Sequence, residues 1–387
     1  MYQTGNEMAK KLRQTLPKEF SDFYYSCTSE FKHKWTDEDI KKFKELLEPC
    51  DVNARERGGC KRTVIHFGGL PFEIIKWQVE RGADVNAANS YGTPLFEYAA
   101  DGNYEVCSYF LEHGADVNIE DYAKQNVLFY AVLRGLRTNP RVVALLLEHG
   151  ADPGHVCSNI GDHRTPLLEL LSDGLEAVNN KQAEAARILL AAQRKNGPIP
   201  EDQWFRAQKY VKSMSRAVAR NKVRFPEEDS TELDEALAKY CAMFCIEPDP
   251  VIQPHDGKSP IHLDEKLSHN EQFRYLWDYL VPAAGKCQTL QGEVIRAAGR
   301  IEDEINGNGG ANWDAQYGKM LKALLVYLSQ GNPLAPEDIQ TAKTAAHDIV
   351  ARKCNCDLAP DILIECALMW VRQNPNPVEL GKVDYNR

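Results

Sequence analysis

The residues best suited to acid–base chemistry lie on one predicted helix, over 290–305. Two carboxylates and two guanidiniums occur there at steps of three, four and four residues, which places them on one helical face. They are Glu293, Arg296, Arg300 and Glu304, and Trp313 and Asp314 follow after the glycine-rich break at 306–310. Paired carboxylates catalyse proton transfer when a closed site shifts their pKa. The same spacing also gives ordinary helical ion pairs, each worth about 0.2–0.5 kcal/mol. We therefore regard Glu293, Arg296, Arg300, Trp313 and Asp314 as a candidate polar pocket and favour ion-pair scaffolding as the interpretation.

The cysteines do not predict a metal site. There are 11 of them, an odd number, and the polar first residues show no apolar leader, so we expect reduced, packed thiols and a cytoplasmic protein. Cys354, Cys356 and Cys366 give three thiols, whereas structural zinc takes four ligands, mostly in close pairs. We expect no metal and no cofactor. The sequence contains no phosphate-binding loop and no nucleophile elbow, which disfavours an enzyme without excluding one.

Charge is unevenly distributed along the chain. The net charge is −10, yet residues 194–224 carry nine basic and two acidic side chains, a local balance of 9 − 2 = +7. A helix predicted over 198–225 holds most of these cations. We weigh nucleic-acid binding by this helix below contact with a partner or packing within the protein, because an acidic chain repels nucleic acid and acidic membranes. Apolar runs such as 323–328 are too short to span a membrane.

Two short strings recur in the first half of the chain. The first occurs as Asp51-Val52-Asn53-Ala54, Gly82-Ala83-Asp84-Val85-Asn86-Ala87, Gly114-Ala115-Asp116-Val117-Asn118 and Gly150-Ala151-Asp152-Pro153, with its Asp residues 33, 32 and 36 apart. The second follows about ten residues later as Thr63-Val64-Ile65-His66, Thr93-Pro94-Leu95-Phe96, Asn126-Val127-Leu128-Phe129 and Thr165-Pro166-Leu167-Leu168. Thr before Pro is typical of a helix start, and Gly114 suits a helix end. Each unit has too small an apolar face to fold alone, so the units must stack.

These strings resemble the ankyrin repeat, over about residues 36–192. The resemblance implies an all-α solenoid with an N-terminal half-repeat and four units, at 55–87, 88–119, 120–155 and 156–192. The family's Thr-Pro-Leu-His is complete nowhere, and its histidine remains only as His66, so we expect packing to hold the other loops. Unit one is short, with Gly68-Gly69 where two alanines are usual, and insertions lie around 136–140 and 174–182.

The remaining segments are predicted as further helices. Residues 1–35 are expected to form a helical cap, 193–247 basic connecting helices, 248–373 a helical C-terminal domain and 374–387 a loose tail. Residues 280–314 resemble a helical module found in uncharacterised bacterial proteins, which suggests a bacterial or phage source and implies no activity.

The resemblance also implies where a partner binds. Ankyrin repeats bind proteins through their turn tips and the exposed side of their first helices, and the matching positions here include Arg57, Tyr91, Asp101, Glu120, Tyr122 and Arg134. Tyr91 and Tyr122 are the amphipathic side chains that dominate interfaces. The alternative interpretation is that these are only solvated turns.

Two functions follow from these observations. The preferred hypothesis is a non-enzymatic interaction protein that binds and masks a partner protein, as an immunity protein against a basic toxin or effector or as an inhibitor of a host system. The alternative is a hydrolase or transferase activity in the C-terminal helical domain, with the repeats selecting the substrate.

Overall fold

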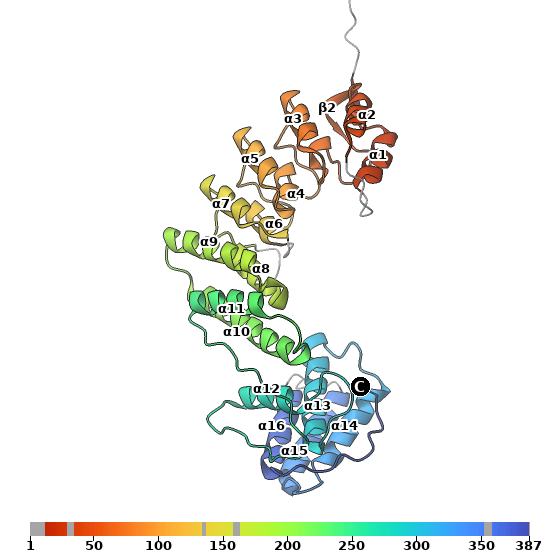
Figure 1. The fold of residues 1–387 in the computed structure, drawn as a ribbon. Coiled ribbons are helices and arrows are strands. Elements are labelled where there is room, and N and C mark those ends of the chain that lie inside the picture. The colour runs from red at the N-terminus through yellow and green to blue at the C-terminus, as the bar shows by residue number, and fades with distance from the viewer. Residues whose placement is uncertain (1–11, 29–34, 134–136, 158–162, 352–357, 387) are drawn as a thin grey trace, which may run out of the picture. The chain divides into compact units, whose positions relative to one another are not determined.

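The computed structural model describes residues 12–28, 35–133, 137–157, 163–351 and 358–386 (Figure 1). The chain divides into two compact units. The first contains the described residues up to Val218 together with Asp229–Asp249. The second contains Ala219–Glu228 and the described residues from Pro250 onward. The all-α class predicted from the sequence is confirmed, because helices account for nearly all of the regular structure.

The first unit begins with a small cap. Strand β1 (Arg13–Thr15) pairs in parallel with β2 (Cys50–Arg55), and helices α1 (Lys18–Thr28) and α2 (Asp37–Leu47) lie between them in the chain. Thr36 and Asp39 form a reciprocal capping box that starts α2. Phe20 and Phe43 are fully buried against each other. The sequence does not predict the two strands: β1 has only three residues and carries no readable alternation, and β2 overlaps the string Asp51-Val52-Asn53-Ala54, which we assigned to the half-repeat.

Repeated helix pairs follow the cap. Their elements are η1 (Val64–His66) and α3 (Phe72–Glu80), α4 (Pro94–Ala100) and α5 (Tyr104–Glu112), α6 (Val127–Leu133) and α7 (Pro140–Glu148), and α8 (Pro166–Ser172), η3 (Gly174–Ala177) and α9 (Asn180–Asn196). Thr165 caps α8 by accepting a hydrogen bond from the backbone N–H of Leu168 at 3.3 Å. In unit one the first helix is reduced to the single turn η1, because Gly68 and Gly69 follow it and Gly69 has a φ of +72°.

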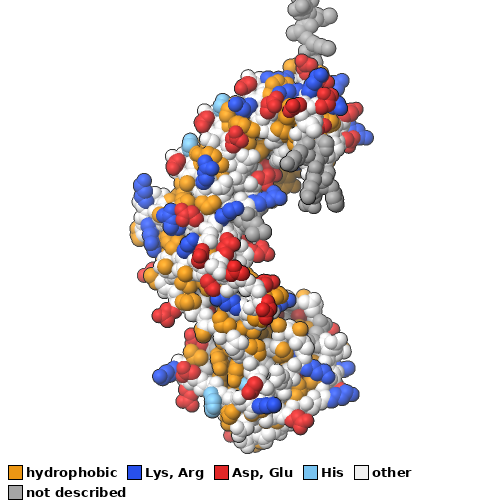
Figure 2. Space-filling model, viewed as in Figure 1, with side chains coloured by type: hydrophobic (Ala, Val, Ile, Leu, Met, Phe, Trp, Pro, Cys, Tyr) orange, Lys and Arg blue, Asp and Glu red, His pale blue; other side chains and the backbone are white. Residues whose placement is uncertain are grey.

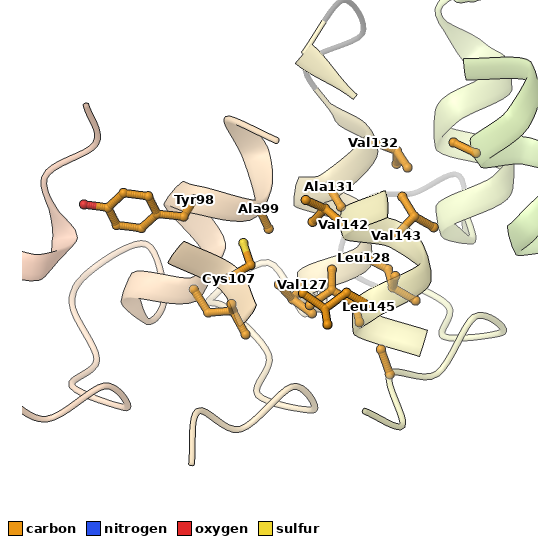
Figure 3. Packing of buried hydrophobic residues seen from close by; sticks show 14 of the residues in the cluster. Tyr98, Ala99, Cys107, Val127, Leu128, Ala131, Val132, Val142, Val143 and Leu145 are labelled. Atoms are coloured by element: carbon orange, nitrogen blue, oxygen red, sulfur yellow. The ribbon is translucent and has the colours of Figure 1, made fainter. Parts of the chain in front are cut away.

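The repeats share one continuous apolar core. Figure 3 shows side chains of α6 and α7, among them Val127, Ala131 and Val142, turned toward one another, and all three are at most 2% exposed. A buried polar contact joins neighbouring units, since the hydroxyl of Tyr98 donates to the carbonyl of Phe67 at 2.8 Å. Helices α10 (Glu201–Arg224) and α11 (Thr231–Phe244) extend the same core with Met214 and Tyr240. The basic helix therefore packs within the protein through its apolar face.

The second unit is built around α13 (Leu290–Glu302). Its other helices are α12 (His269–Leu280), α14 (Ala315–Tyr327), α15 (Pro336–Ala351) and α16 (Ala359–Gln373), and α13 continues into a π-helical turn, η4 (Asp303–Gly307). Every residue of α13 except Arg300 and Glu302 is buried. Gly299 permits this packing, because a Cβ there would lie 2.5 Å from the ring of Trp277. None of the described helices is long and apolar enough to cross a membrane.

The expectation of a loose tail at 374–387 is wrong for its described residues. The backbone of Val378 exchanges hydrogen bonds with α13, donating to Gln291 at 3.0 Å and accepting from Leu290 at 2.9 Å. Tyr385 is only 8% exposed. We call residues 374–386 the C-terminal strap. The sequence misled us because the strap has no helical periodicity, and its contacts with Gln291 and Glu293 are made with residues more than 80 positions away.

Candidate partner-binding surface

Three loop tips of the first unit form the candidate surface. We call them finger one (55–62), finger two (88–92) and finger three (120–125), and we call their exposed side together the finger surface. Backbone contacts hold fingers one and two together: Ser90 donates its N–H to the carbonyl of Cys60 at 3.2 Å. Arg55 donates through Nη1 to the carbonyls of Lys61 at 2.8 Å and Ala88 at 2.7 Å. The fingers are therefore fixed by hydrogen bonds and not by packing alone.

Tyr91 and Tyr122 are brought together by this arrangement. Their rings meet edge to face with centroids 6.4 Å apart, while 54% of Tyr91 and 72% of Tyr122 stay exposed. The backbone of Tyr91 is held by Asn89, whose side chain accepts its N–H at 2.5 Å. The thiol of Cys60 also contacts the hydroxyl of Tyr91 and raises the pKa of Tyr91. Two adjacent exposed aromatic rings on a fixed backbone are well suited to anchoring a partner.

Finger three is supported from below by Tyr130. Its hydroxyl donates to Oδ2 of Asp121 at 2.6 Å, and its ring packs edge-on against Phe96 with centroids 4.7 Å apart. The other oxygen of Asp121 accepts the backbone N–H groups of Ala123 and Gln125, each at 2.8 Å. Burial and the carboxylate of Asp121 raise the pKa of Tyr130, so its hydroxyl stays protonated and keeps donating. Finger three is thus held in place by hydrogen bonds to Asp121, while the ring of Tyr122 stays exposed.

Finger one is stabilised by an ion pair. Arg62 meets Glu56 through Nε at 2.9 Å and Nη2 at 3.1 Å, a bidentate arrangement, and its Nη2 also reaches the hydroxyl of Tyr25 at 3.4 Å. Burial of Arg62 works against its charge, but the contact with Glu56 prevails and raises the pKa of Arg62. Arg57 is exposed at the tip. Tyr25 and Arg62 join the surface from positions that the repeat pattern alone does not mark.

The comparisons with known proteins identify this scaffold. Residues 64–157 match the ankyrin-repeat family, described as three copies. They are ankyrin repeats. The chain is also 32% identical over 97 residues to an inactive serine/threonine-protein kinase, TEX14, of Bos taurus. The aligned residues make up 25% of this chain. Only 6% of the length of that relative is matched. The ankyrin repeats make this part of the chain a protein–protein interaction module.

The remaining predicted contact residues lie apart from the tyrosine pair or engage other groups. Asp101 ends α4 and pairs with Arg137 of the next unit, Nη1 to Oδ1 at 2.7 Å. Glu120 is exposed but lies 3.1 Å from Nζ of Lys124 and 3.7 Å from Nε2 of His155. Arg134 lies outside the described residues. On the face shown in Figure 2, positive and negative side chains are interspersed over the first compact unit, which contains the ankyrin repeats and which we call the ankyrin unit.

The candidate polar pocket of the second unit is closed. Glu293 is fully buried, and its Oε2 lies 2.6 Å from Nη2 of Arg296, which is 8% exposed. Tyr385 of the strap donates its hydroxyl to Oε1 of Glu293, and Arg296 donates to the carbonyl of Gly285 at 3.0 Å. Burial alone would lower the pKa of Arg296, but Glu293 keeps it raised. These contacts are those of a buried ion pair that stabilises the fold.

The other residues of that pocket have structural roles or point elsewhere. Arg300 is exposed, and Asp314 caps α14 by accepting the N–H of Gln316 at 2.9 Å. Trp313 stacks on Tyr317 with centroids 5.4 Å apart. Glu304, which is buried, accepts the N–H of Asn312 at 2.6 Å. Sequence spacing placed Glu293, Arg296, Arg300 and Glu304 on one helix but could not show which of them the strap covers.

Seven of the nine described thiols are buried, whereas Cys60 is half-buried and Cys245 is exposed. Burial, followed by the nearby carboxylate of Glu293, raises the pKa of Cys287 to about 12. Within the described ranges, no three His, Cys, Asp or Glu side chains come together as a metal would require. Cys354 and Cys356 fall outside those ranges, while Cys366 is buried.

Proposed function

We propose that this protein works without catalysis, by binding a partner protein across the finger surface and masking it. The observation that carries the proposal is the exposed pair Tyr91 and Tyr122, held edge to face on loops that hydrogen bonds fix in place. Because the surface is ordered before binding, it loses less conformational entropy when a partner associates. Exposed aromatic rings that contribute nothing to the core are otherwise a liability for solubility.

The finer part of the proposal concerns the role of that partner. An inhibitor that covers an active surface needs no chemistry of its own, which suits a chain whose candidate base, Glu293, is fully buried. We propose that the partner is a toxin or effector, or a component of a host system, and that the protein acts in the cytoplasm. The net charge of −10 favours a basic partner, but this charge belongs to the whole chain and not to the finger surface in particular.

No specific observation favours the alternative, a hydrolase or transferase in the second unit. Oε1 of Glu293 accepts the hydroxyl of Tyr385, and Oε2 lies 2.6 Å from Nη2 of Arg296 in a fully buried position. A general base must reach a substrate proton within hydrogen-bonding distance. Catalysis at Glu293 would therefore require the strap to leave its present position.

Affinity capture with paired variants tests the proposal. The full chain is used as bait in nuclease-treated lysates of bacterial strains, and captured proteins are read by mass spectrometry. We expect one stoichiometric partner that Tyr91→Ala with Tyr122→Ala loses, and that Tyr91→Phe with Tyr122→Phe retains in part. Phe205→Ala is the matched control, because Phe205 is 69% exposed but lies on α10, outside the fingers. Equal capture by the double alanine variant would overturn the proposal.

A further inference from the structure

We infer that the partner segment that binds fingers one and two is acidic. The inference rests on the proposed function of the finger surface and specifies the chemistry of what it binds. It runs against the expectation of a basic partner, which came from the net charge of the whole chain.

The cations of finger one outnumber its carboxylates. Residues 55–62 carry Arg55, Arg57, Lys61 and Arg62 against Glu56 alone, a balance of 4 − 1 = +3. Glu56 is engaged with Arg62. The guanidinium of Arg55 donates to two backbone carbonyls, which fix its position and leave its positive charge uncompensated. Arg57 and Lys61 are exposed, and neither has an ion-pair partner among the described residues.

The carboxylates of finger three are already engaged. Asp121 is buried and accepts three hydrogen bonds, from Tyr130, Ala123 and Gln125. Glu120 lies between Lys124 and His155. The charge that remains available on the finger surface is therefore positive, although the chain as a whole is acidic. Local charge governs recognition here, since charges beyond about 8 Å are largely screened at physiological salt.

The aromatic rings lie beside these cations. Tyr25 is 54% exposed and contacts Arg62, and Tyr91 contacts Cys60 in the same finger that carries Arg57 and Lys61. A partner segment that combines carboxylates with an apolar side chain would meet both features at once: its carboxylates would pair with Arg57 and Lys61, and its apolar side chain would cover Tyr91 and Tyr122. Arg–carboxylate contacts add geometric specificity as well as attraction.

Peptide display on the full chain tests this inference. Random peptides are selected on the wild-type protein and then counter-screened on the Tyr91→Ala with Tyr122→Ala variant. We expect the peptides that depend on the tyrosines to be net negative and to contain at least one apolar residue. One such peptide, labelled, is then the probe for affinity measurements by fluorescence anisotropy.

The variant Arg57→Glu with Lys61→Glu should weaken binding of that probe at least tenfold, and raising NaCl should weaken binding to wild type. Lys319→Glu with Lys322→Glu is the control, because it changes the net charge by the same −4 at two exposed positions of α14; it should stay within twofold of wild type. Arg57→Glu alone serves as a second variant, and circular dichroism checks that each variant folds.

The outcomes separate the two proposals. Tyrosine-dependent peptides that are neutral or basic, or a probe indifferent to reversal of Arg57 and Lys61, would overturn the acidic partner and leave the finger surface as a binding site. If selection yields no peptide that depends on Tyr91 and Tyr122, the finger surface does not bind and both proposals fall.

Discussion

In the first unit, which contains the ankyrin repeats, the aromatic side chains of interest lie at loop tips, whereas in the second unit the candidate carboxylate lies in the core. Tyr122 is 72% exposed on finger three, while Glu293 is fully buried on α13. The difference follows from architecture. A solenoid buries only the faces between neighbouring units, so its loops remain accessible. A bundle around a central helix buries most of that helix, and the charged groups it buries must then be paired.

This comparison shows how to distinguish a binding residue from a scaffolding residue. In both units, residue type alone suggested function. In both units, neighbouring residues hold the side chain of interest in place. Only in the fingers does that side chain stay exposed to solvent. Each prediction below tests whether that distinction holds, beginning with the largest expected effect on stability.

The largest effect is expected from Glu293→Ala. It leaves Arg296 buried without its carboxylate, and loss of one partner of a buried ion pair costs about 3–5 kcal/mol of unfolding free energy. Hydrogen exchange read by mass spectrometry should show faster exchange over α13 and unchanged exchange over the ankyrin helices. Arg300→Ala, on the exposed position of the same helix, is the control. A variant as stable as wild type would return Glu293 to the list of candidate catalytic groups.

Tyr385→Phe should have the next largest effect. The substitution keeps the ring but removes the hydroxyl that donates to the carboxylate of Glu293, and a hydrogen bond to a charged group is worth about 1.5–3 kcal/mol. Exchange should accelerate over the strap and the start of α13. Lys382→Ala, an exposed position of the strap, should leave exchange unchanged. If both variants behave alike, the strap is held by its backbone contacts only.

Lowering the pH should weaken unit one through His66. The Nδ1 atom of His66 accepts the N–H of Thr63 at 3.1 Å, and burial lowers the pKa of His66 to about 4. The unfolded chain takes up this proton near pH 6.5 and the folded chain does not, so stability is lost as pH falls from about 6.5 toward 4. Between pH 7.5 and 5 the loss from this group is about 2 kcal/mol.

The variant His66→Gln provides the comparison, because it removes the titrating group at that position. Thermal unfolding and hydrogen exchange over η1 and α3 would be measured at both pH values. The wild type should lose more stability than the variant over this range. Parallel losses in the two proteins would show that His66 is protonated in the folded state as readily as in the unfolded chain.

The smallest effect on stability is expected at the finger surface. Because Tyr91 and Tyr122 are exposed, the double alanine variant should keep its melting temperature within about 2 °C of wild type. Differential scanning calorimetry measures this directly. A large drop would show that the two rings support the fold, and loss of partner capture could then not be assigned to the contact itself.

The sequence predicted the repeated units well because each is a local pattern. Thr93 before Pro94 sets a helix start within two residues, and the glycine-alanine-aspartate turn recurs at the spacing of one unit. Tyr91 and Tyr122 could be placed on one surface for the same reason. Burial of Glu293 could not be predicted, since it depends on Tyr385, 92 positions away. Tyr25 was missed because its place on the surface depends on Arg62, 37 positions away.

The hydrogen bonds at two successive joints of the ankyrin array follow one pattern that an added copy would also satisfy. Asn53 donates through Nδ2 to the carbonyl of Gly82 at 3.4 Å and accepts the N–H of Asp84 at 2.8 Å. One unit later, Asn86 makes the same two contacts, with Gly114 and Asp116, each at 2.8 Å. Consider an in-frame duplication that runs from Asp84 to the residue before Asp116. The copy would carry both the asparagine side chain and the backbone groups that such an asparagine contacts. Tandem duplication could therefore lengthen this array, and with it the row of fingers, without a new interface having to evolve.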